Sequence, residues 1–127
     1  MARIESFEEL EIWKEARELS KFVRELSQKE PFSKDFRFSS QINSAAGSIM
    51  DNIAEGFERD GNREFINFLF IAKGSNGEVR SQSYRAIDSK FISMQEFEIL
   101  LKKTESLKRK IFNLITTLRN SGTKGYK

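Results

Sequence analysis

The fold of this chain is decided by the stretch QINSAAGSIMDNIAEG, which runs from Gln41 to Gly56. Its apolar side chains recur at steps of three and four residues and share one helix face: Ile42, Ala45, Ala46, Ile49 and Ile53. A polar row follows beside them at the same steps: Gln41, Ser44, Ser48, Asn52 and Glu55. A surface helix normally carries Lys, Glu and Arg there, so small polar groups indicate close approach of another helix. The alternative interpretation is a ligand or nucleic-acid site along this row.

Three more segments have helical apolar spacing. The first predicted helix opens with a capping box at Ser6 and Glu9 and is stopped by Pro31. The last opens with a second capping box at Ser93 and Glu96 and continues as a regular heptad seam. The four helices are expected at residues 7–29, 38–59, 63–90 and 94–119.

These elements predict an all-α protein. A chain of 127 residues fits a single domain, and one Pro and seven Gly leave few turns for a many-stranded sheet. Four amphipathic helices with short links favour an antiparallel up-down-up-down four-helix bundle. Residues 120–127 are expected to form a loose C-terminal tail.

Several kinds of chemistry are excluded by composition. The chain has no His and no Cys, which rules out the usual zinc sites, catalytic Ser-His-Asp and Cys-His systems, and di-iron bundles. No phosphate-binding loop or EF-hand spacing is present, so we expect no cofactor and no metal. Without a long apolar run or an apolar leader, no membrane association is expected. The lack of Cys favours a cytoplasmic location.

The polar row has a counterpart in the third predicted helix. We expect the two rows to face each other as a structural polar network of Ser48, Asn52, Glu55, Ser75, Glu78 and Gln82. Gly74 and Gly77 predict that the two backbones come close at that level. Catalysis by Glu55, Glu78 and Lys73 is the least favoured alternative, because a structural network explains the same residues and no catalytic site is indicated.

The start of the third helix is apolar nearly all the way round. In a monomeric bundle this helix would need only one apolar face. The additional apolar side chains therefore indicate a contact with another subunit or protein. The expected oligomer interface consists of Phe65, Ile66, Phe68 and Phe70. The alternative is that these side chains only fill the core.

Positive charge is concentrated at the C-terminal end. Residues 1–100 hold 14 basic and 18 acidic side chains, whereas residues 101–127 hold eight basic and one acidic. A nucleic-acid partner, RNA or DNA, would be drawn there. The candidate contacts are Lys102, Lys103, Lys108, Arg109, Lys110 and Arg119. No aromatic side chain is expected to interleave with these charges, and an ordinary solvated face is the alternative.

The chain resembles the bacterial four helix bundle protein family, also called the 23S rRNA intervening-sequence protein family. The resemblance rests on Asn52-Ile53-Ala54-Glu55-Gly56 and Ile71-Ala72-Lys73-Gly74-Ser75, with Phe7, Leu10 and Trp13 upstream. Gln41-Ile42, Ala45-Ala46, Ser48-Ile49 and Glu78 also match. The similarity extends over residues 6–118.

The resemblance implies a four-helix bundle that assembles into a homopentamer and has no established enzymatic activity. It also implies a link to accessory proteins of diversity-generating retroelements, which bind nucleic acid and a reverse transcriptase. In one place the chain departs from the family, because Asn43 and Ser44 stand where relatives often carry basic residues. A scaffold that binds proteins and no nucleic acid remains the alternative function.

Overall fold

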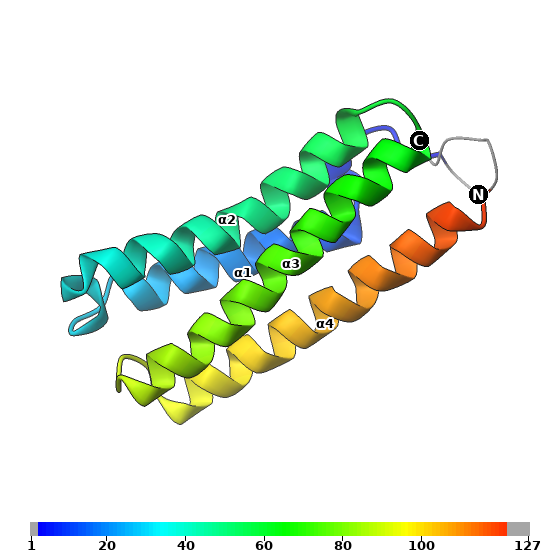
Figure 1. The fold of residues 1–127 in the computed structure, drawn as a ribbon. Helices are drawn as coiled ribbons and strands as arrows, with labels where there is room; N and C mark the ends of the chain where they lie inside the picture. Colours follow the sequence, from blue (N-terminus) through cyan, green and yellow to red (C-terminus); the bar gives the residue numbers. More distant parts are fainter. Residues whose placement is uncertain (1–2, 122–127) are drawn as a thin grey trace.

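The computed structural model describes residues 3–121, in which four long α-helices form an elongated bundle without strands (Figure 1). The helices are α1 (Glu11–Ser27), α2 (Phe36–Glu58), α3 (Gly61–Asp88) and α4 (Met94–Arg119). Two short 3-10 turns, η1 (Phe7–Glu9) and η2 (Phe32–Lys34), precede α1 and α2. The predicted all-α four-helix bundle is therefore confirmed.

The first helix begins later than expected. The Ser6–Glu9 capping box forms, but it caps the 3-10 turn η1, and the predicted helix from residue 7 is wrong in this part. Leu10 adopts an extended backbone with ψ of 127° and is buried in the core. Its carbonyl accepts the first amide hydrogen bonds of α1 from Trp13 and Lys14. The chain thus interrupts the helix where Leu10 turns inward.

The other helix ends lie close to their expected places. Asp35 caps α2, since its Oδ1 accepts from the Phe38 amide at 3.0 Å, and the helix starts two residues early. Gly61 opens α3 with a φ of +81°, a conformation that favours glycine. The Ser93–Glu96 capping box of α4 is confirmed by hydrogen bonds of 2.8 and 3.1 Å.

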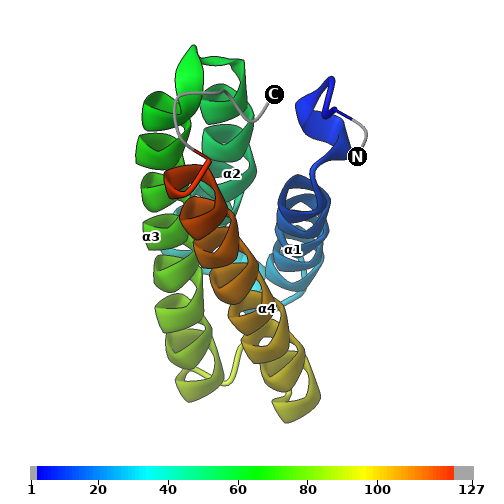
Figure 2. The same cartoon turned by 90° about the vertical axis from the view of Figure 1, so that its right-hand side faces the viewer.

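The core consists of large aliphatic and aromatic side chains from all four helices. Its fully buried members include Leu19, Ile49, Leu69, Leu107 and Ile111. Helix α2 packs against both α1 and α3, and α3 packs against α4, whereas α1 and α4 form the smallest contact between neighbouring helices. Figure 2 shows α4 running obliquely between α3 and α1. The bundle is therefore tightest along α2 and α3 and most open between α1 and α4.

Among the helical glycines of the described part, only Gly56 lies at a close contact between helices. A Cβ on Gly56 would lie 2.6 Å from the Phe68 Cβ and 3.1 Å from the Phe65 Cδ1. Gly74 and Gly77 have no atom within 4 Å of such a position. The expected close approach at Gly74 and Gly77 is wrong because both residues lie on the solvent side of α3.

Candidate nucleic-acid interface

The two predicted polar rows meet at one point between α2 and α3. The hydroxyl oxygens of Ser48 and Ser75 lie 3.0 Å apart. Asn52 extends this contact, since its Nδ2 donates to the Ser48 carbonyl oxygen at 2.8 Å and to the Ser48 hydroxyl at 2.9 Å. These three side chains satisfy one another where the helices come together.

Within residues 3–121, the other three members of the predicted network form no hydrogen bond with these side chains, although Glu78 and Gln82 line the same cleft as Ser48 and Ser75. Glu55 is exposed and accepts a 2.9 Å hydrogen bond from Arg59, which raises the pKa of that guanidinium. Glu78 is exposed on the rim of a cleft of about 400 Å³ between α2 and α3. Gln82 lines the same cleft with only 5% of its surface exposed, and its Oε1 accepts no hydrogen bond within residues 3–121.

Asn43, where the resemblance implies a basic residue, forms hydrogen bonds within the bundle. Asn43 donates from its Nδ2 to the Ser27 hydroxyl and to the Ser39 carbonyl oxygen, both at 2.8 Å. It therefore ties α2 to the end of α1. Ser44 is exposed beside the α2–α3 cleft. Neither side chain supplies a positive charge to that face.

A second polar cluster, between α3 and α4, was missed from the sequence. The Asn76 Nδ2 donates to the Thr104 carbonyl oxygen at 2.8 Å. The Arg80 Nη1 donates to the Leu101 carbonyl oxygen at 2.8 Å and to the Thr104 hydroxyl at 3.0 Å. The sequence does contain a signal for this cluster, because each helix has a polar residue on its apolar seam, Asn76 in α3 and Thr104 in α4. Buried polar side chains of this kind usually form hydrogen bonds.

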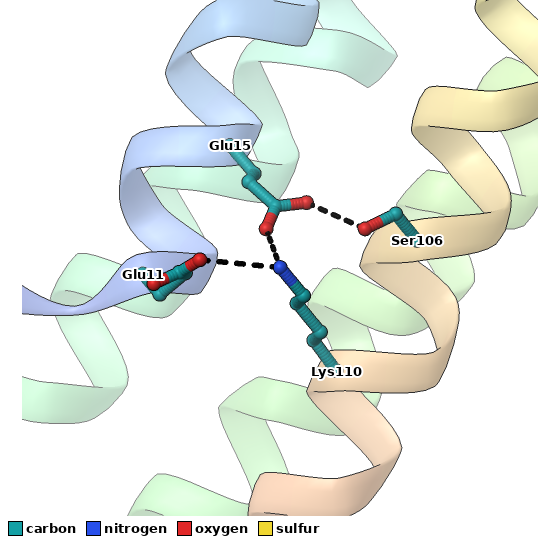
Figure 3. Close-up of polar contacts among 4 residues, drawn as sticks. All are labelled: Glu11, Glu15, Ser106 and Lys110. Atoms are coloured by element: carbon teal, nitrogen blue, oxygen red, sulfur yellow. Dashed lines mark hydrogen bonds and ion pairs between the residues drawn. The ribbon is translucent and has the colours of Figure 1, made fainter.

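Lys110 of α4 forms ion pairs with two acidic side chains of α1. Figure 3 shows its ammonium group between Glu15, which it contacts directly, and Glu11, whose Oε1 lies 3.2 Å from the Lys110 Nζ. The Ser106 hydroxyl donates to the other Glu15 oxygen at 2.9 Å. These contacts join α1 to α4 where the two helices otherwise touch little. Lys110 therefore bridges α1 and α4.

Lys110 gives a pH-dependent contribution to stability. Its hydrogen bonds with Glu15 and then Glu11 raise the pKa of the ammonium group. A raised pKa in the folded state means that the contribution is fully present below the unfolded pKa of about 10.4 and is lost as pH rises through the folded value. We expect Lys110→Met to unfold at a lower temperature than the wild type near neutral pH, with the difference shrinking above about pH 10.4. Thermal unfolding followed by circular dichroism measures this, and a difference that grows at high pH would contradict it.

Lys102 and Lys103 also lie beside acids. Both line a cleft of about 510 Å³ between α1 and α4, together with three carboxylates, Glu11, Glu15 and Glu18. The ammonium of Lys103 lies 6.0 Å from the ring centre of Phe22. Neighbouring carboxylates repel a phosphate backbone, so this side of α4 is a poor surface for nucleic acid.

The remaining basic residues of α4 turn towards α3. Lys108 and Arg109 line a shallow cleft of about 350 Å³ with Lys73 of α3, and only one acid, Glu105, shares it. Within residues 3–121, Lys73, Lys108 and Arg109 form no ion pair. Arg119 lies farther along this side, with its guanidinium carbon 5.2 Å from the ring centre of Phe70 on α3.

An exposed aromatic ring lies among these cations. Phe112 lines the cleft, is 47% exposed, and follows Lys108 and Arg109 by one helical turn. The expectation that no aromatic interleaves with the basic residues is wrong, because the heptad places Phe112 outside the core. We call the set Lys73, Lys108, Arg109, Phe112 and Arg119 the α3–α4 basic surface.

The predicted interface residues divide between core and surface. Phe65 is fully buried, Ile66 packs against the core, and Phe68 is half-buried beneath the Arg59 guanidinium. Phe70 is 40% exposed, and its unpredicted neighbour Ile71 is 52% exposed. Phe65 is therefore inaccessible to another subunit, whereas the side chains of Phe70 and Ile71 are accessible.

The described residues define an antiparallel four-helix bundle with a divided basic surface. The chain belongs to the 23S rRNA-intervening sequence protein family, whose model matches residues 8–113. A solved structure from Bacteroides thetaiotaomicron, a protein of unknown function from the S23 ribosomal protein family, is similar with a TM-score of 0.75. The match has 21% identity and covers 82% of this chain and 97% of that chain, so it establishes the shared fold. No curated protein matches this chain.

No feature of the described part indicates catalysis. Within residues 3–121, no three acidic side chains gather in a way that would hold a metal ion. None of the helices in this part of the chain is both long and apolar enough to cross a membrane.

Proposed function

We propose that this protein is a non-enzymatic homo-oligomer that binds nucleic acid through the α3–α4 basic surface. The observation that carries the proposal is the distribution of partners among the cations. Lys110 is held by Glu11 and Glu15, and Lys102 and Lys103 share their cleft with three carboxylates. Lys108 and Arg109 form no ion pair among the described residues and share their cleft with one carboxylate, Glu105. Unpaired cations release counterions from phosphates on binding, which supplies affinity with little dependence on base sequence.

Self-association is proposed through the outer side of α3. Phe70 and Ile71 place adjacent exposed apolar side chains there, and Gly74 adds a position without a side chain one turn later. A second copy covering this side would remove the apolar surface from water. The family resemblance favours a pentamer. It also favours an accessory role in a ribonucleoprotein or beside a reverse transcriptase.

The proposal is tested by measuring RNA and duplex DNA binding across a salt series while light scattering reports the mass. We expect a multimer whose affinity falls steeply between about 50 and 200 mM salt. A stable multimer with no binding at low salt would contradict nucleic-acid binding and favour a protein scaffold. A monomer that binds RNA or DNA would contradict the proposed self-association but leave the proposed nucleic-acid binding intact.

A substitution on α3 tests the proposed subunit contact. We expect Ile71→Asp to reduce the mass measured by light scattering, because it would place a charge in an apolar interface. Ile99→Asp is the matched control, since Ile99 is a 41% exposed isoleucine on α4. Equal masses for the wild type and Ile71→Asp would exclude this side of α3 as the interface.

A further inference from the structure

Within residues 3–121, the exposed ring of Phe112 has no cation over it, a property that it shares with the exposed ring of Phe36. Five other rings have a cationic group within 6.0 Å of the ring centre: Trp13, Phe22, Phe38, Phe68 and Phe70. Within residues 3–121, Phe112 has no such cation and no ring–ring contact. Three cations nevertheless line the same cleft. Its ring is therefore exposed and uncovered in a positively charged setting.

This arrangement has the two parts that recognition of a single strand needs. Proteins that bind single-stranded nucleic acid combine a positive groove along the backbone with aromatic side chains on which bases stack. Lys73 and Lys108 come from the two sides of the cleft, and Phe112 presents a flat apolar surface between α3 and α4. A duplex keeps its base faces stacked inside, so it can contact these cations but not the ring.

We propose that the cleft of Lys73, Lys108, Arg109 and Phe112 is a binding site for unpaired nucleotides, in which a base stacks on Phe112 and phosphates contact the three cations. The proposal rests on the nucleic-acid binding proposed above and specifies the strand that is bound. The single carboxylate of the cleft, Glu105, leaves the cations in excess. Stacking is tolerant of sequence because every base has a π-face, so the site selects for strandedness rather than for one base.

The test compares oligo(U), oligo(dT) and a duplex of about 20 residues each, by fluorescence anisotropy at constant salt. We expect both single strands to bind more tightly than the duplex. Phe112→Leu, which keeps apolar bulk but removes the ring, should weaken single-strand binding about tenfold and leave duplex binding unchanged. Phe112→Trp should retain the preference for single strands. Phe36→Leu is the control, because Phe36 is an exposed ring at the start of α2.

The possible failures are distinguishable. Equal binding of duplex and single strands, with no effect of Phe112→Leu, would overturn the stacking site while leaving nucleic-acid binding intact. Absence of binding by any probe at low salt would overturn both proposals. A change of mass in Phe112→Leu, seen by light scattering without nucleic acid, would assign the ring to a protein contact and overturn the inference.

Discussion

Neutralising the α3–α4 basic surface is expected to abolish most nucleic-acid affinity. The triple variant Lys73→Gln, Lys108→Gln and Arg109→Gln removes the three cations that line the Phe112 cleft. At about 50 mM salt we expect single-strand affinity to fall roughly a hundredfold. The slope of log affinity against log salt should decrease by about 2, since each lost phosphate contact contributes about 0.7 on a single strand. A salt titration by anisotropy measures both quantities.

The matched control removes three cations that line the cleft between α1 and α4. Lys14, Lys102 and Lys103 line the acid-rich cleft between α1 and α4, and their replacement by Gln causes the same change in net charge. We expect a small loss of affinity and an unchanged salt slope, because these side chains lie among carboxylates. Equal losses in both triple variants would mean that net charge, and not this surface, determines binding.

The second large effect is expected at Gly56. Alanine there would bring a Cβ within 2.6 Å of the Phe68 Cβ, so α2 and α3 must shift apart. Overpacking of this kind costs about 1–3 kcal/mol, which outweighs the roughly 1 kcal/mol that alanine gains over glycine in a helix. We expect Gly56→Ala to lower the free energy of unfolding measured in urea.

Gly47 provides the control on the same helix. A Cβ at Gly47 has no neighbouring atom within 4 Å, so Gly47→Ala should raise the free energy of unfolding by up to about 1 kcal/mol. Opposite signs for the two substitutions would confirm that α2 meets α3 closely at Gly56. A stabilising Gly56→Ala would contradict this geometry.

The fold was predictable because hydrophobic spacing and capping are local signals. The heptad seam and the Ser93–Glu96 capping box fixed α4 at its observed bounds of Met94–Arg119. The Ser6–Glu9 capping box is also present as predicted, but it caps the short 3-10 turn η1 and not the α-helix. Leu10 packs into the core with an extended backbone, and this tertiary contact, which the local sequence does not specify, stops the capped turn from continuing as an α-helix.

The candidate site was less predictable, because charges on one helix were read without their neighbours. Lys108 and Lys110 flank the same heptad seam, but Lys110 contacts the carboxylates of α1, whereas Lys108 lines the cleft that it shares with Lys73 of α3. The choice depends on which helix lies on each side of α4. The heptad already places Phe112 outside the core, but its position in one cleft with Lys73 depends on the path of α3.

Crosslinking tests the central claim most directly. RNA that carries 4-thiouridine would be bound to the wild-type protein, irradiated, and the crosslinked peptides identified by mass spectrometry. We predict crosslinks to Phe112 and its neighbours on α4, together with the segment of α3 around Lys73. Crosslinks confined to the α1–α4 cleft around Lys14 and Lys103, with none at Phe112, would contradict the α3–α4 basic surface as the nucleic-acid site.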